Sequence, residues 1–135
     1  MPHLFRMAQP PRLPITADQI AAVVAAFYAR VRADPALGPV FAAHVTDWPA
    51  HEAKITRFWR NAILFDRGYD GNPLLVHRAA GDVHAALFAP WLTLFDTTLT
   101  ATLPPDLAEG WSVLAHRIGR GLRMGLESDG PPRLG

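Results

Sequence analysis

The chain has 135 residues, half of them apolar, with 13 basic side chains, 12 acidic ones and no cysteine. A chain of this length buries roughly two thirds of the surface that its unfolded form exposes, which is enough for one domain that encloses a ligand. The lack of cysteine excludes disulfides, iron–sulfur clusters, thiolate-bound metals and a cysteine nucleophile. The net charge of +1, with arginines scattered along the chain, argues against a nucleic-acid partner.

No segment has the features of a membrane span or a signal peptide. The longest apolar run, Ile20 to Ala29, has ten residues, fewer than the ~18 that a membrane span needs. The stretch from Met1 to Gln9 lacks a charged start followed by an apolar region. We therefore expect no membrane partner and a cytoplasmic location.

Both ends of the sequence have the composition of tails. Residues 1–14 contain four prolines and show no periodicity, and residues 128–135 have a similar character. These patterns predict flexible tails outside the fold and a single domain over residues 15–127.

The first predicted helix has a well-defined start and end. Thr16 and Gln19 form a capping box, and Ile15 and Ile20 flank it at the positions of a hydrophobic staple. Pro35 ends the helix. The apolar stripe between these points has helical spacing and consists of Ile20, Val24, Phe27 and Val31.

After a short apolar piece over residues 40–43, a second helix is predicted to start at Asp47-Trp48-Pro49, since proline near a helix start loses no hydrogen bond. Its apolar residues continue to about Phe65. Turn-forming residues then fill residues 68–73, and a short helical segment follows over residues 74–80.

Two more helices complete the pattern. One carries Trp91, Phe95 and Leu99, and the last is opened by Pro104-Pro105-Asp106. Pro90 requires either that the first of these begins near Ala89, with the proline in its first turn, or that it is kinked there. No stretch alternates with a period of two for long enough to form a strand, so the fold class is all-α with four principal helices.

Six histidines require an explanation, because imidazole is a common metal ligand and proton carrier near neutral pH. No two of them stand four residues apart with a glutamate between them, the spacing of a zinc protease. A zinc site made of histidine and carboxylate ligands remains an alternative. His51 and His77 lie on two helical segments joined by the turn-rich loop. Such a helical hairpin can enclose a gap for a flat cofactor. The alternative is that each is a core histidine satisfied by a backbone carbonyl. His116 shares its helix with arginines on a predicted solvated face.

Eight short motifs, taken in chain order, give the sequence over residues 15–126 a resemblance to the group III truncated haemoglobins. The other truncated groups carry Gly-Gly pairs at helix junctions, and this sequence has none. The motifs are Phe27-Tyr28, Val31-Arg-x-Asp34, Leu37-Gly-Pro-Val-Phe41, Trp48-x-x-His51, Phe58-Trp59, Tyr69-x-Gly71-x-Pro73, His77 and Phe88-x-x-Trp91-Leu-x-Leu-Phe95.

The resemblance implies a truncated globin fold, a two-on-two helical sandwich around a non-covalently bound haem b. It places the proximal iron ligand at His77, and it places Tyr28, His51 and Trp91 on the distal side, as the residues that take part in any catalysis. Phenol and indole donors in a pocket of low dielectric constant stabilise a polar bound ligand more than they do in water.

The resemblance also implies the remaining haem contacts. Two departures from the family pattern, Pro90 and Ala80-Gly81, imply that the proximal side is anchored differently, and they keep His84 open as a rival iron ligand. The predicted apolar wall consists of Phe41, Ile55, Phe58 and Leu94, and the candidates for the propionate rim are Lys54, Arg57, Tyr69 and Arg78.

The expected function is binding of O2, NO and CO at a five-coordinate iron. Three polar donors favour retention of the ligand, so we expect oxygen, nitric oxide or peroxide redox chemistry with an unidentified electron donor, rather than bulk oxygen transport. Two alternatives stay open: a haem-based sensor or binding module, and a helical bundle that binds a non-haem metal.

Overall fold

The computed structural model describes residues 11–67 and 85–129, and within these ranges all regular structure is helical. None of the helices described there is long and apolar enough to cross a membrane. The elements are α2 (Ala17–Ala33), α3 (Leu37–His44), α4 (Trp48–Leu64), the 3-10 helix η1 (Ala85–Leu87), α6 (Phe88–Thr102) and α7 (Pro105–Asp129).

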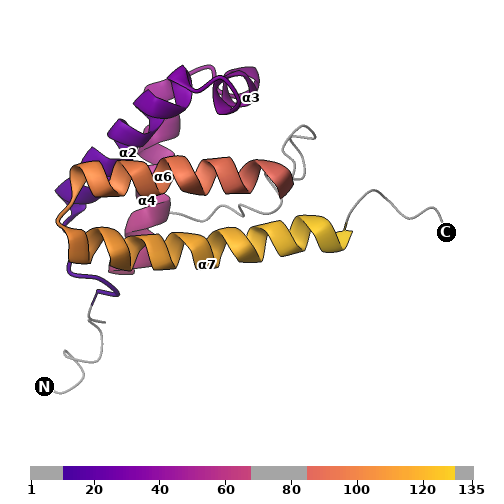
Figure 1. The fold of residues 1–135 in the computed structure, drawn as a ribbon. Helices are drawn as coiled ribbons and strands as arrows, with labels where there is room; N and C mark the ends of the chain where they lie inside the picture. The colour runs from indigo at the N-terminus through magenta and orange to yellow at the C-terminus, as the bar shows by residue number, and fades with distance from the viewer. Residues whose placement is uncertain (1–10, 68–84, 130–135) are drawn as a thin grey trace, which may run out of the picture.

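The helices form two packed pairs. Helix α6 runs beside α7 in the opposite direction, because only a short connection joins them, and α2 packs against α4 (Figure 1). Helix α2 also packs against α6, which stacks one pair on the other. Helix α3 packs against α2 at the end away from α7. This arrangement confirms the all-α class and the two-on-two helical sandwich.

The local signals read from the sequence start helices α2 and α4 as predicted. The Thr16 side chain accepts from the Gln19 amide at 3.1 Å, and the Gln19 side chain accepts from the Thr16 amide at 2.9 Å. The Asp47 carboxylate accepts from the Ala50 amide at 3.0 Å and caps α4. These bonds satisfy amides that have no partner within the helix.

Pro90 lies in the first turn of α6, which begins two residues earlier at Phe88. An amide in the first turn has no carbonyl partner within the helix, so proline costs little there. The structure therefore confirms the first of the two predicted arrangements, a helix that starts close to Pro90.

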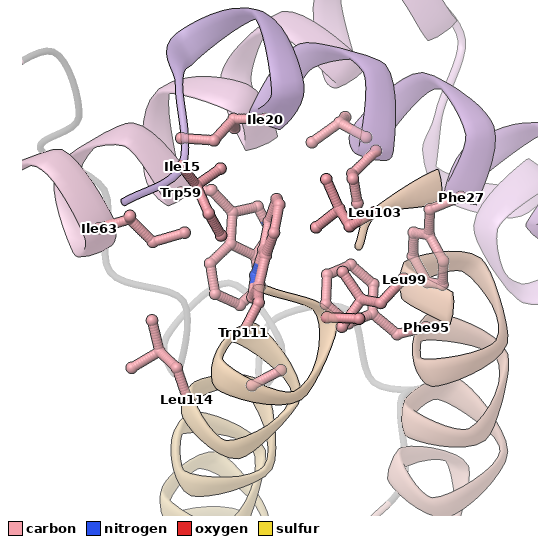
Figure 2. Close-up of a cluster of buried hydrophobic side chains, with 14 of the residues drawn as sticks. Ile15, Ile20, Phe27, Trp59, Ile63, Phe95, Leu99, Leu103, Trp111 and Leu114 are labelled. Carbon is pink, nitrogen blue, oxygen red and sulfur yellow. The ribbon is translucent and has the colours of Figure 1, made fainter. Parts of the chain in front are cut away.

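An aromatic cluster forms the core between the two pairs. Trp59 stacks on Phe95 with ring centroids 5.5 Å apart, and Trp111 meets Trp59 edge to face at 5.4 Å (Figure 2). Phe27 from α2 meets Phe95 edge to face at 5.0 Å. Trp59 is 3% exposed, so it is a packing residue of the core. Edge-to-face and offset stacked pairs add to the stabilisation from burial of apolar surface.

The predicted tails are too long at both ends. The Arg12 amide donates to the Ile63 carbonyl at 2.7 Å, and its guanidinium donates to the Ala62 carbonyl at 3.1 Å. Leu13 packs against the core. These contacts join the segment before α2 to the end of α4, so residues 12 and 13 belong to the fold. At the other end α7 continues to Asp129, two residues into the predicted tail.

Two glycines of α7 differ in what surrounds them, and this difference predicts opposite effects on stability. A Cβ at Gly121 meets nothing within 4 Å, whereas one at Gly110 lies 2.9 Å from Leu13 Cδ2. We expect Gly121→Ala to raise the free energy of unfolding by up to about 1 kcal/mol through helix propensity. Gly110→Ala gains less or destabilises, because Leu13 must move. Urea unfolding of the two variants measures the difference, and equal gains would show that Leu13 does not pack against α7.

Candidate functional site

Tyr28 lies at the centre of a group of aromatic rings contributed by three helices. It is 2% exposed, and its ring meets His51 edge to face with centroids 5.0 Å apart. Phe41 from α3 lies 5.8 Å away and Trp48 from the first turn of α4 lies 6.1 Å away. We call these four residues, Tyr28, Phe41, Trp48 and His51, the aromatic box. Phe27, the residue before Tyr28, is directed into the core. Because consecutive residues of a helix point about 100° apart, Tyr28 is directed to the side of α2 where the other three rings lie.

His51 is held in the box by ring contacts. Phe41 and Trp48 each lie 6.2 Å from the imidazole, both edge to face. The Nε2 atom of His51 is buried and has no hydrogen-bond partner among the described residues. A buried polar atom without a partner costs free energy, so a ligand or water that bonds to this atom would stabilise the site.

Burial keeps both polar groups of the box uncharged. It raises the pKa of the Tyr28 hydroxyl far above its ordinary value, and the nearby Glu52 carboxylate raises it further. Burial also lowers the pKa of His51, and the Lys54 ammonium lowers it further. At neutral pH the phenol therefore keeps its proton and the imidazole is neutral.

Trp91 joins this site through Phe27. The Trp91 ring meets Phe27 edge to face at 5.2 Å and stacks on Phe95 at 5.2 Å. Phe27 in turn meets Tyr28 at 5.1 Å. Trp91 is half-buried in the first turn of α6. The structure thus brings Tyr28 and His51 into direct ring contact, and it connects Trp91 to them through one intervening ring.

The other predicted site residues within the described ranges lie on α3, α4 and α6. Four of them are half-buried apolar side chains packed against the core, namely Phe41, Ile55, Phe58 and Leu94. Lys54 and Arg57 are exposed on α4. The effect of the Lys54 charge on the pKa of His51 places it near the box. Tyr69, His77, Arg78 and the rival ligand His84 lie outside the described residues.

Two interactions were not anticipated from the sequence. The guanidinium of Arg32 lies over the Trp48 ring, 4.7 Å from its centroid. The sequence signal that could have indicated this contact is helical spacing. Arg32 follows Tyr28 by one helical turn on α2, and Trp48 precedes His51 by about one turn on α4, so each lies on the same face of its helix as a site residue. Sequence spacing gives no indication, however, that α2 and α4 face each other along these residues.

His116 is not simply part of a solvated face, as its neighbouring arginines suggested. Its Nε2 atom lies 2.7 Å from the Asp96 carboxylate on α6. The Ser112 hydroxyl donates to the other oxygen of Asp96 at 2.6 Å. The three side chains connect α6 to α7, and His116 is partly exposed.

The fold and the sequence both match proteins of one family. A solved structure of the group III truncated haemoglobin from Campylobacter jejuni is similar to this chain, with a TM-score of 0.80 and 30% sequence identity. The similarity covers 87% of this chain and 95% of the solved one. The group 3 truncated haemoglobin ctb of Campylobacter jejuni is 35% identical over 89 residues, which are 63% of this chain and 70% of that protein. No family profile matches the chain.

The chain belongs to the group III truncated haemoglobins. It is therefore a member of a family of haem-binding globins that bind diatomic gases. The globin has the expected two-on-two fold, and family membership favours haem over the non-haem metal bundle. Among the described residues, no group of three or more histidine and carboxylate side chains is placed to hold a metal ion.

The described residues of this globin fit a haem and its ligand. Half-buried apolar side chains from α3, α4 and α6 supply the kind of wall that a flat apolar group requires. The buried Nε2 atom of His51 has no partner among the described residues, so it leaves a polar group available to a ligand or water. The Tyr28 hydroxyl and the His51 imidazole, both neutral, suit an uncharged ligand that takes part in a hydrogen bond.

The electrostatics of the box predict the titration of His51. We expect an NMR titration to give a midpoint below the value of about 6.5 for an exposed histidine. Lys54→Gln should raise this midpoint by removing a nearby cation, but it should stay below that of an exposed histidine because burial is the larger cause. Arg60→Gln serves as the control, since Arg60 pairs with Asp66 at the other end of α4.

The sign of the effect on stability follows from the lowered pKa. Between the folded-state pKa of His51 and about 6.5, the unfolded chain binds more protons than the folded chain. The contribution of neutral His51 to stability is therefore complete above this window and is lost as the pH falls through it. A midpoint at or above that of an exposed histidine would contradict a buried His51.

Proposed function

We propose that this globin holds haem b through His77 and uses Tyr28 and His51 to bind O2 and related diatomic molecules, in redox chemistry rather than in bulk oxygen transport. The supporting observation is the contact between the Tyr28 and His51 rings, 5.0 Å apart, with Nε2 of His51 buried and without a partner in the part of the chain that the structure describes. Residues 15–127 form the proposed globin domain, extended by the packed residues 12 and 13 and by the end of α7.

The residues that would hold the haem are drawn from several segments. When bound to the protein, haem would supply an iron that binds O2, NO or CO and exchanges electrons with these ligands. His77 is the proposed fifth iron ligand, and Lys54, Tyr69 and Arg78 are the proposed partners of the propionates. Phe41, Ile55, Phe58 and Leu94 form the proposed apolar wall.

Tyr28 is the proposed principal donor to the ligand. Its raised pKa keeps the hydroxyl protonated at neutral pH and well above it, so it stays a donor. Burial at 2% exposure keeps bulk water from competing for that donor. A hydrogen bond to a group that carries partial negative charge is stronger in such surroundings than in water.

His51 and Trp91 are the proposed supporting groups. Because its pKa is lowered, the His51 imidazole is neutral at pH 7 and offers either a donor or an acceptor, depending on its tautomer. Trp91 contributes an indole N–H from the α6 side, in a ring that Phe27 and Phe95 hold in position. Tyr28 and Trp91 thus approach from different helices.

This donor set suits chemistry on a retained ligand better than rapid release. Bulk transport requires fast dissociation, whereas hydrogen bonds to the ligand slow it. The proposed reactions are oxidation of nitric oxide to nitrate and reduction of peroxide. Nitric oxide, O2 and one electron give nitrate, so this reaction needs an electron donor, which is the proposed protein partner.

Removal of the Tyr28 hydroxyl tests the role of the donor. Tyr28→Phe keeps the ring contacts of the box and loses one hydrogen bond of about 1.5–3 kcal/mol, so we expect O2 to dissociate about 10- to 100-fold faster. Stopped-flow spectroscopy measures this rate. Dissociation of CO, a less polar ligand, serves as the control in the same variant and should change much less.

The same variant tests the redox proposal. If Tyr28→Phe leaves both the O2 dissociation rate and the rate of nitrate formation from nitric oxide unchanged, the proposed role of the box is wrong. An equal change for O2 and CO would indicate an altered pocket rather than a lost hydrogen bond.

Replacement of His77 tests the iron ligand. We expect His77→Ala to lose haem affinity or the absorption band of five-coordinate ferrous haem, because the iron loses its protein ligand. His116→Ala is the matched control, since His116 pairs with Asp96 between α6 and α7, and it should keep both. Absorption spectra of the ferric, ferrous and CO-bound forms make the comparison. A normal spectrum for His77→Ala, with loss in His84→Ala, would assign the ligand to His84.

A further inference from the structure

Arg32 and Trp48 form a second contact between the two helices that carry Tyr28 and His51. The Arg32 guanidinium lies 4.7 Å from the centroid of the Trp48 ring, a cation–π contact. Arg32 is one helical turn after Tyr28 on α2, and Trp48 is about one turn before His51 on α4. The pair is therefore a neighbouring contact between the same two helices, beside the Tyr28–His51 pair.

Trp48 contacts both the exposed cation and the two polar residues Tyr28 and His51. Arg32 is exposed and Trp48 is half-buried, whereas Tyr28 is buried. The Trp48 ring also meets Tyr28 at 6.1 Å and His51 at 6.2 Å. A change in the position of the indole thus reaches both polar residues of the box.

The position of His51 depends on ring packing because Nε2 of its side chain has no hydrogen bond among the described residues. Among the described residues, three rings border the imidazole, from Tyr28, Phe41 and Trp48. Trp48 is the ring that also has a contact with an exposed charged side chain. It is half-buried and lies in the first turn of α4, whereas Tyr28 is buried.

We propose that Arg32, acting through Trp48, is a positioning residue that holds the His51 imidazole against Tyr28 and so sets how readily a ligand enters and leaves the box. This inference rests on the proposed function, because it takes the Tyr28–His51 side of the box to face the ligand. Arg32 itself touches neither His51 nor the ligand in this arrangement. Its contribution is to restrict the Trp48 indole, which forms one of the three walls around His51.

The test compares three variants of the haem-loaded, CO-bound protein: Arg32→Ala, Arg32→Lys and Arg30→Ala. Arg30 is the matched control, because it lies on the same helix and donates to the Ala26 carbonyl of its own helix. Fluorine NMR of 5-fluorotryptophan, assigned with Trp48→Phe, reports the position of Trp48. NMR titration reports the surroundings of His51, and flash photolysis reports the CO association rate.

We expect Arg32→Ala to shift or broaden the Trp48 resonance, to move the pKa of His51 up toward its ordinary value, and to speed CO association about two- to fivefold. Arg32→Lys retains a cation near the ring and should restore most of all three readouts. Arg30→Ala removes one positive charge from the same helix. It should change the Trp48 resonance, the pKa of His51 and the CO association rate much less than Arg32→Ala does.

Two results would overturn the inference. If Arg32→Ala moves the Trp48 resonance but leaves both the His51 titration and CO association unchanged, Trp48 does not position His51. If Arg30→Ala and Arg32→Ala shift the pKa of His51 equally, the effect is one of net charge and not of contact. Either result is distinct from failure of the proposed function, which appears as unchanged O2 dissociation in Tyr28→Phe while Arg32 is intact.

Discussion

Phe27 and Tyr28, two consecutive residues of α2, connect the core of this globin to its site. The two rings lie 5.1 Å apart, edge to face, and they face different neighbours. Phe27 meets Phe95 and Trp91 on α6, and Tyr28 meets Phe41 and His51. Because consecutive residues of a helix point about 100° apart, one helix can serve both the core and the site. The packing of the core therefore fixes the position of Tyr28.

Burial at this position has an electrostatic consequence. The box excludes water from Tyr28 and from Nε2 of His51, and exclusion of water disfavours the charged form of each group. The result is a protonated phenol beside a neutral imidazole, the pair of groups that can hydrogen-bond a small uncharged molecule without binding an anion strongly. The cations of this region, Arg32 and Lys54, stay exposed at its edge.

Helix ends were predictable from the sequence because their causes are local. The Thr16 and Gln19 capping box, the Asp47 cap and the position of Pro90 in the first turn of α6 each depend on residues within four positions of one another. The prolines before Ile15 gave a misleading signal. They exclude regular structure, but they do not exclude packing, and the hydrogen bonds of Arg12 to the end of α4 join that segment to the fold.

The sequence by itself determined the all-α class, the starts of α2 and α4 and the family resemblance, and it predicts Tyr28, His51, Trp91 and His77 as site residues. Tertiary structure decided which of the described side chains meet. The contacts of Tyr28 with His51, of Arg32 with Trp48 and of Asp96 with His116 each join two different helices. Periodicity gives the direction of a side chain around its own helix, but it carries no information on which neighbouring helix lies there or at what height, because that depends on how all the helices share one core.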